Sequence, residues 1–279
     1  MGKLLKIKGI ENRNMRRLLK SGWLLFAVSI TAFGVQNVLW ARHGEAVLPI
    51  IPWLPGVPGI AYTTGAAFLL AGICIGFNLI ARWAAVLLGL LFLVFEIFLQ
   101  IPRAVARPMD LSLRTVVFEV FTMCASAFML AGILSLGNHN SGRWREAGHG
   151  LIQSGRFLFA ASSIVFGISH FIVPQFIASL IPVWIPGPGL FWAYLTGIAF
   201  VAAGLSFATN WMSRWAGILL GLMFLLWFLV LHVPRVMSYP RSHDPAEWSS
   251  AFIALGLCGG SWIAANALQD KAPGMVSGD

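Results

Sequence analysis

The sequence predicts an all-α membrane protein of about eight transmembrane helices, built as a tandem parallel duplication of a four-helix bundle. Its composition predicts the class. Apolar residues make up 58% of the chain, charged residues only 10%, and the mean hydropathy is +0.80, whereas soluble domains carry about 25% charged residues. A helix that crosses the hydrocarbon needs about 20 apolar residues. The 279 residues therefore accommodate eight spans joined by short loops.

Apolar runs bounded by Arg, Pro or Asn define the individual spans. The predicted spans are 22–40, 60–80, 84–101, 114–136, 157–173, 190–208, 215–233 and 249–268. The polar stretch 137–156 is the predicted linker, which is cytoplasmic and lies between two four-helix repeats, 22–136 and 157–268. Residues 1–21 form a predicted basic arm, and residues 269–279 a C-terminal tail.

The two halves repeat one pattern of residues at an offset of 132 positions. Tyr62-Thr63-Thr64-Gly65 aligns with Tyr194-Leu195-Thr196-Gly197, Arg82-Trp83-Ala84 with Arg214-Trp215-Ala216, and Pro102-Arg103 with Pro234-Arg235. Arg, Trp, Pro and Tyr do not align together by chance in apolar sequence, so we infer an internal duplication. Because each half contains an even number of spans, both halves enter the membrane from the same side, unlike the inverted repeats of many transporters.

The charge distribution predicts the orientation. The net charge is +9, and seven of the nineteen Lys and Arg residues lie in the first twenty positions. Cytoplasmic segments of membrane proteins are rich in Lys and Arg, so both termini are predicted to be cytoplasmic in an inner (plasma) membrane. Contact of the basic arm with anionic headgroups of the lipid bilayer accounts for the charge and leaves no need for a nucleic-acid partner. Cys74, Cys124 and Cys258 lie in apolar spans, as buried packing residues do.

Several ionisable residues fall in the outer half of the membrane, within or just beyond the predicted spans. They are Glu96, Arg103, Glu119, His170, His232 and Arg235. An ionisable group in hydrocarbon costs about 2.5–3.5 kcal/mol on insertion scales, so each is a candidate for function. Purely structural roles are an open alternative. Glu96 and Glu119 could form salt bridges with Arg103, Arg107 or Arg114, and the two histidines could make hydrogen bonds within the protein. No nucleophile motif or metal-ligand triad is visible, and nothing further supports axial haem ligation by two histidines. The sequence predicts no metal and leaves enzymatic activity open.

Two apolar, proline-rich segments lie on the predicted outer side. They are residues 49–56 and 181–188, with Trp53 and Trp184 at related positions. Proline restricts the backbone, so these stiff segments could cover a site between the helices. Trp is also enriched at the headgroup level, so an interfacial anchor is an equal alternative.

The second half resembles the DoxX family of small four-helix membrane proteins. The resemblance rests on Phe166-Gly167-Ile168-Ser169-His170-Phe171, Ile181-Pro182-Val183-Trp184-Ile185-Pro186, Tyr194-Leu195-Thr196-Gly197 and Ser213-Arg214-Trp215-Ala216. The first half is similar through Trp53-Leu54-Pro55, Tyr62, Thr64-Gly65 and Arg82-Trp83-Ala84. The chain thus looks like two fused DoxX-like units. Several relatives carry an acidic residue soon after the Thr-Gly pair, where this chain has Phe68 and Phe200. The resemblance therefore does not imply acid-dependent chemistry for this chain.

The resemblance implies a link to membrane redox chemistry and to a redox partner in or outside the membrane. The leading hypothesis is a protein that binds a quinone or similar ligand in an outward-facing cavity. The predicted ligand-binding residues are His170, His232 and Arg235 for the polar head, Trp184 and Tyr194 for the ring, and Glu96 and Arg103 nearby. The alternative is a carrier or scaffold without chemistry, for a small hydrophobic solute or a partner protein. The sequence establishes neither a cofactor nor an oligomeric state.

Overall fold

The computed structural model describes residues 2–41, 58–137, 142–238 and 246–268, and all of its regular structure in these ranges is helical. The α-helices are α1 (Gly2–Ala41), α2 (Pro58–Gly76), α3 (Ala81–Phe95), α4 (Ile101–Ala106), α5 (Leu111–Gly137), α6 (Gly142–Ile172), α7 (Pro174–Leu180), α8 (Gly189–Thr209), α9 (Ser213–Trp227), α10 (Val233–Ser238) and α11 (Ala246–Ala267). Two π-helical segments, η1 (Glu96–Gln100) and η2 (Phe228–His232), join α3 to α4 and α9 to α10. The segment 49–56 and the tail 269–279 lie outside the described residues.

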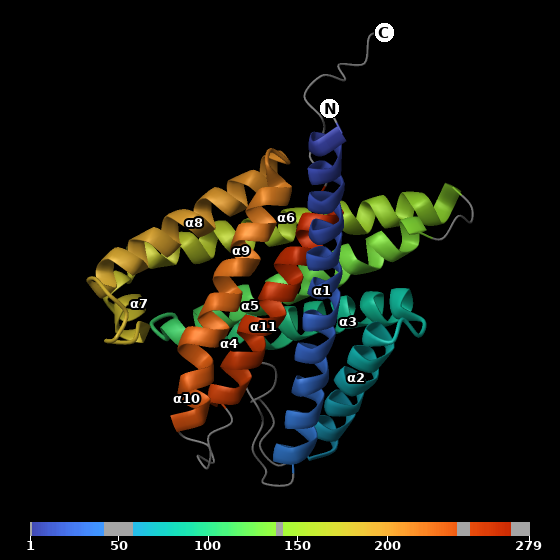
Figure 1. Cartoon of the computed structure of the whole chain (residues 1–279). Coiled ribbons are helices and arrows are strands. Elements are labelled where there is room, and N and C mark those ends of the chain that lie inside the picture. Colours follow the sequence, from blue (N-terminus) through green and yellow to red (C-terminus); the bar gives the residue numbers. More distant parts are fainter. Residues whose placement is uncertain (1, 42–57, 138–141, 239–245, 269–279) are drawn as a thin grey trace.

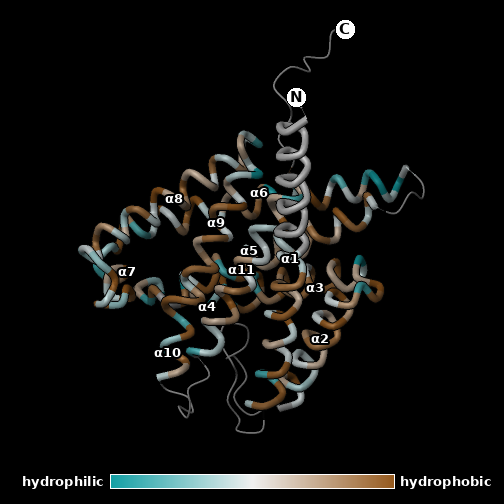
Figure 2. The backbone as a smooth tube through the Cα atoms, in the orientation of Figure 1, coloured by the Kyte–Doolittle hydropathy of each residue, from teal (hydrophilic) through white to brown (hydrophobic). Residues whose placement is uncertain are grey.

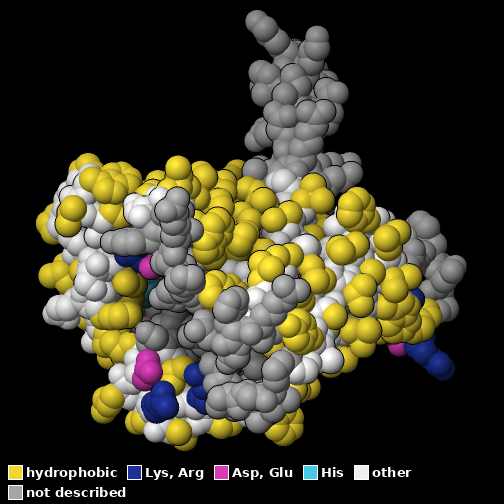
Figure 3. Space-filling model, turned by 90° about the horizontal axis from the view of Figure 1, so that it is seen from below, with side chains coloured by type: hydrophobic (Ala, Val, Ile, Leu, Met, Phe, Trp, Pro, Cys, Tyr) yellow, Lys and Arg dark blue, Asp and Glu magenta, His cyan; other side chains and the backbone are white. Residues whose placement is uncertain are grey.

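The all-helical class and the number of spans are confirmed. Eight helical segments in the described residues are long and apolar enough to cross a membrane, and each overlaps one predicted span. In Figure 2 hydrophobic residues dominate these helices, and hydrophilic residues gather near helix ends, as at the start of α6. The face in Figure 3 is covered mainly by hydrophobic side chains, with charged groups in small clusters. A surface of this kind matches hydrocarbon and not water.

The predicted linker 137–156 is mostly helical, because α5 extends to Gly137 and α6 already begins at Gly142. The charged residues Arg143, Arg145, Glu146 and Arg156 lie in the first half of α6. A helix can continue beyond the hydrocarbon into the polar headgroup region, where charged side chains are stable. Hydropathy therefore marks where the apolar part of α6 starts, and not where the helix starts.

The third and seventh spans contain matching irregularities ahead of a proline. In each, the backbone widens into a π-helix, so that Ile101 N–H donates to Glu96 O and Val233 N–H donates to Phe228 O. Pro102 and Pro234 follow directly. Because a proline ring lacks an N–H and collides with the carbonyl four residues earlier, a wider turn relieves the collision. The turns before α3 and α9 match as well, with positive φ at Asn78 and Ile80 and at Asn210 and Met212.

Neighbouring helices approach closely at glycines, and these contacts also recur. A Cβ atom at Gly34 on α1 would lie 2.8 Å from Gly65 O on α2, and one at Gly167 on α6 would lie 2.8 Å from Gly197 O on α8. Small residues allow such approach, which helix packing in lipid depends on. Recurring contacts are what a duplication would produce, and the duplication itself stays a prediction.

The two halves of the chain are joined by exchange of their last helices. Helix α5, the final span of the first half, packs along α6 of the second half, while α11 packs along α1 of the first half. Helices α5 and α11 also meet each other. The resulting four-helix groups therefore mix both halves: one contains α2, α1, α11 and α9, and the other contains α8, α6, α5 and α3.

These two groups run in different directions. In Figure 1, α1, α9 and α11 run roughly from top to bottom, whereas α6 and α8 run across them. No single direction is parallel to all the long helices. We therefore expect the helices to cross a bilayer at a tilt, as membrane helices do over a range of up to about 40°.

Candidate functional site

Two adjoining hollows lie along the contact between α5 and α6. The first, the His170 cleft, has a volume of about 420 Å³ that includes space open to the surroundings, and is lined by Leu111, Arg114, Thr115, Phe166, Ser169, His170, Ile172, Val173, Phe176 and Ile177. The second, the Glu119 chamber, has a volume of about 280 Å³ and is lined by Phe118, Glu119, Thr122, Phe159, Ser162, Ser163, Phe166, Phe200, Leu220, Phe224 and Leu257. Phe166 lines both. The two hollows therefore follow one another along the same pair of helices.

His170 is the polar group at the wall of the cleft that has an unused hydrogen-bonding atom. Its side chain is only 1% exposed, and Nδ1 lies 2.8 Å from Phe166 O. Because a carbonyl oxygen only accepts, Nδ1 carries the hydrogen in this contact. Nε2 is buried and has no partner among the described residues. The ring is held between Phe166 and Phe200, with ring centroids 5.2 and 5.3 Å away, so the imidazole orientation is fixed by packing.

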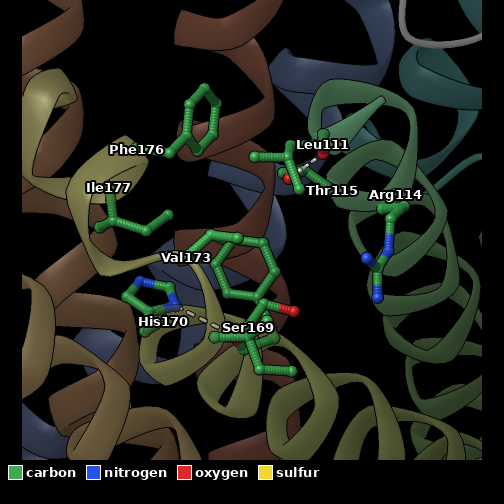
Figure 4. Close-up of a pocket in the computed structure, with 10 residues that line it drawn as sticks. Leu111, Arg114, Thr115, Ser169, His170, Val173, Phe176 and Ile177 are labelled. Carbon is green, nitrogen blue, oxygen red and sulfur yellow. Dashed lines mark hydrogen bonds between the residues drawn. The ribbon is translucent and has the colours of Figure 1, made fainter. Parts of the chain in front are cut away.

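The lining of the cleft includes one cationic side chain. Arg114 on α5 lies on the opposite side of the cleft from His170 on α6 (Figure 4) and is exposed. The hydroxyl groups of Thr115 and Ser169 donate to the carbonyls of Leu111 and Val165, at 2.9 Å each. Their oxygen lone pairs stay available as acceptors. A ligand head in the cleft would thus meet one cation, one imidazole and two hydroxyl oxygens.

The Glu119 chamber places one carboxylate among aromatic rings. Glu119 is half-buried on α5, and within the described ranges its carboxylate has neither an ion pair nor a hydrogen bond. A salt bridge between Arg114 and Glu119, one of the structural roles left open by the sequence, is therefore not formed in this part of the chain. Five phenylalanine side chains and the hydroxyls of Thr122, Ser162 and Ser163 complete the wall.

The corresponding contact, between α1 and α11, is closed by hydrogen bonds. Ser29 on α1 donates to Phe252 O on α11 at 2.6 Å, and Ser249 on α11 donates to Gln36 Oε1 at 3.5 Å. The alignment of the helices, supported by the matching contacts of Gly89 with Phe128 and of Gly221 with Trp262, pairs Ser29 with Ser162, Phe252 with Phe118, Gln36 with Ser169 and Ser249 with Thr115. The residues that close the contact between α1 and α11 are thus the counterparts of residues that line the two hollows.

Glu96 and Arg103 lie away from both hollows, in the first half. Glu96 is fully buried in η1, and neither carboxylate oxygen has a partner among the residues described. The Arg103 Nη1 atom donates instead to Gln100 Oε1 at 3.2 Å. The salt bridge between Glu96 and Arg103 that the sequence left open is therefore not formed here. Neither residue lines the cleft or the chamber.

His232 and Arg235 also lie outside the two hollows. His232 is half-buried at the end of η2, and its Nδ1 atom has no partner in the described part of the chain. Arg235 on α10 donates through Nη2 to Leu180 O at 2.9 Å, which ties α10 to the end of α7. The structure thus places Arg235 in a structural contact, and does not bring His232 to the cleft with His170.

The two aromatic residues predicted to pack on a ligand ring face outward. Trp184 is 60% exposed in the turn that follows α7. Tyr194 is half exposed on α8 and stacks on Phe171, with ring centroids 5.9 Å apart. Of the alternatives for segment 181–188, the exposure of Trp184 favours the anchor over a cover. The cleft is instead bordered by α7, through Phe176 and Ile177.

Sequence reasoning missed α7 and the residues it contributes. The available signal was Pro174, because proline is favoured in the first turn of a helix, followed by the apolar residues Phe176 and Ile177. Thr115 and Ser169 were missed because hydroxyl residues are common in membrane helices and carry no distinctive pattern. In the described part of the chain, no group of three or more His, Cys, Asp or Glu is placed to hold a metal ion.

Comparison with known proteins gives one match. A family model described as a domain of unknown function (DUF8561) matches residues 159–257. No curated protein and no solved structure matches the chain. The matched range includes the parts of α6, α8, α9 and α11 that line the Glu119 chamber and leaves out α5, which supplies Glu119 and Arg114. The resemblance to DoxX stays a prediction.

Proposed function

We propose that the protein is a membrane component that binds a quinone-class ligand, with a polar ring and an apolar tail, in the His170 cleft. The observation that carries the proposal is the buried, unpartnered Nε2 atom of His170 in the wall of an otherwise mostly apolar cleft. A buried polar atom without a partner is unfavourable. A ligand that hydrogen-bonds to Nε2 would remove this cost.

The chemistry of the cleft suits both redox states of a quinone. A hydroquinone hydroxyl can donate to the Nε2 lone pair that is left when Nδ1 carries the hydrogen. The carbonyl of the oxidised ring can accept from the Arg114 guanidinium, which has five N–H donors. Phe166, Phe176 and Ile177 would pack on the ring and on the start of the tail.

The similarity to the DoxX family supports a redox role with a partner protein. In this proposal the chain holds the ligand and a separate redox enzyme, in or outside the membrane, exchanges electrons with it. A carrier or scaffold is the second candidate. It is favoured by the outward-facing Val183 and Trp184, since exposed apolar groups at the end of a helical bundle can anchor a partner or meet headgroups.

Binding to purified protein tests the proposal. We would extract and identify the lipid-soluble molecules that copurify in a mild detergent, and then titrate a short-chain ubiquinone and its quinol by calorimetry. His170→Asn installs the residue that the first half carries at the related position 37, and is expected to weaken quinol binding about tenfold. Trp184→Ala, outside the cleft, is the control and should bind like the unsubstituted protein.

The opposite pattern would contradict this site assignment. If Trp184→Ala lost binding and His170→Asn kept it, the ligand would lie under segment 181–188 and not in the cleft. If only phospholipid copurified and no quinone bound, the scaffold role would replace the quinone role.

The proposed orientation makes a separate prediction. With both termini in the cytoplasm of an inner-membrane protein, a cysteine at Gly142 should resist an impermeant thiol reagent added to intact cells, whereas one at Ser242 should react. The unsubstituted protein controls for Cys74, Cys124 and Cys258, which lie within spans. Labelling at position 142 with protection at position 242 would show that the orientation is inverted.

A further inference from the structure

The Glu119 chamber combines a single ionisable group with an aromatic wall. Of the residues that line it, Glu119 is the only ionisable one, and five are phenylalanines. Lys, Arg and His are absent from this lining. Arg114 lies on the same helix but lines the neighbouring cleft and is exposed. The nearest described cation along α5, Arg114, therefore lies in the neighbouring cleft and not in the chamber with the carboxylate.

The aromatic rings enclose the chamber from several directions. Phe200 stands at 76° to Phe166, with centroids 4.7 Å apart, and at 58° to Phe224, with centroids 5.6 Å apart. Rings that meet at steep angles do not cover each other by flat stacking. A cation is attracted to an aromatic face within about 6 Å of the ring centroid. Walls in different orientations can therefore surround a compact cation.

The carboxylate needs a partner that the described residues do not supply. An ionised group taken out of water without a partner is strongly unfavourable, and Glu119 has no ion pair or hydrogen bond in the described ranges. Phe118 and Glu119 are only half-buried, so the chamber is not sealed. A positively charged ligand would satisfy both the carboxylate and the aromatic faces.

From these observations we propose that the Glu119 chamber binds a small organic ammonium ion, with Glu119 as its counter-ion and phenylalanine faces around its alkyl groups. Recognition of quaternary ammonium groups by aromatic cages is an established use of cation–π attraction. The chamber is small, about 280 Å³ even with the space open to its surroundings included. It favours a compact ion with methyl or single aryl substituents over a large multi-ring cation.

The contact between α1 and α11 provides an internal comparison for this site. The counterpart of Glu119 is Ile253 on α11. The counterparts of Ser162 and Phe118 are Ser29 and Phe252, whose hydrogen bond holds α1 against α11. At the contact between α5 and α6 the acid is present and that bond is absent between Ser162 and Phe118, both of which line the chamber. The carboxylate and the open space therefore occur together, at the contact between α5 and α6.

This site is distinct from the proposed quinone site. His170 lines the cleft and not the chamber, and Glu119 lines the chamber and not the cleft. The two hollows share only Phe166. A test of ammonium binding can therefore succeed or fail independently of quinone binding.

Calorimetry on the full-length protein in a neutral detergent tests the proposal with benzyltrimethylammonium. Its uncharged isostere, neopentylbenzene, controls for hydrophobic partition. The unsubstituted protein should bind the ammonium ion at least about tenfold more tightly than the neutral compound. Glu119→Gln keeps the side-chain shape, removes the charge and should weaken ammonium binding about tenfold or more. Glu146→Gln removes the same charge from the exposed first turns of α6 and should leave binding unchanged.

Two further variants separate the possible explanations. Phe200→Leu keeps an apolar side chain but removes a ring, and should weaken ammonium binding while Glu119 is intact, so it serves as the test if Glu119→Gln does not fold. His170→Asn should leave ammonium binding unchanged even where quinol binding is lost. The proposal is overturned if the unsubstituted protein binds no ammonium ion, if it binds the neutral isostere equally well, or if Glu119→Gln binds like the unsubstituted protein.

Discussion

Replacing Ser169 by glutamine is expected to close the His170 cleft and to weaken ligand binding there by about tenfold or more. The first half carries Gln36 at the equivalent position, where its Oε1 accepts from Ser249 at 3.5 Å. The counterpart of Ser249 is Thr115, which lines the cleft on α5. A glutamine at 169 would therefore reach across toward Thr115 and occupy the space that the smaller serine leaves open.

The reciprocal substitution is the matched control. Gln36→Ser removes the long amide from the first half and leaves the His170 cleft untouched, so ligand binding should match that of the unsubstituted protein. Both variants are measured by calorimetry with the short-chain quinol, after thermal unfolding has shown that they fold. Unchanged binding by Ser169→Gln would mean that the ligand does not occupy this cleft.

Gly167→Leu is expected to cause the largest loss of stability. A Cβ atom at this position on α6 would lie 2.7 Å from Val201 Cγ2 and 2.8 Å from Gly197 O on α8. Because part of this obstacle is backbone, α6 and α8 must move apart. Overpacking of this kind costs about 1–3 kcal/mol or more, and close contact is the main source of helix association in lipid. The unfolding temperature in detergent should fall by several degrees, or the protein should fail to accumulate.

Gly150→Leu makes the same substitution on the same helix in open space. No heavy atom lies within 4 Å of a Cβ built at Gly150. Its unfolding temperature should be close to that of the unsubstituted protein. Equal unfolding temperatures for the two variants would show that α6 and α8 are not in the close contact described here.

The spans were predictable because their signal is local. About 20 consecutive apolar residues specify a membrane helix whatever it packs against, and this holds for α2 and α8 as it does for α11. The start of α6 was not predictable from hydropathy, since a charged extension such as Arg143–Arg156 is helical without being apolar. The short helix α7 was missed because its seven residues are far below the length of a span.

The candidate site was predictable only in part, because sequence position gives depth in the membrane but not the neighbour that a side chain faces. His170 and His232 were placed at similar depth, yet His170 lines the cleft and His232 does not. Glu119 was recognised as an ionisable residue in a span. Its aromatic surroundings, however, arise because α5 packs against α6 of the other half and not only against helices of its own half. Periodicity within one helix contains no information about that choice of partner.

The exchange of α5 and α11 has a consequence for how such a chain can change over time. Because each half completes the other, the molecule behaves as two subunits held at a fixed one-to-one ratio by a single polypeptide, and their association does not depend on protein concentration. If the two halves were separate copies of one chain, every substitution would occur in both copies. In one chain each half can vary alone, so one inter-half contact can be closed by Gln36 and Ser249 while the other stays open around His170 and Glu119.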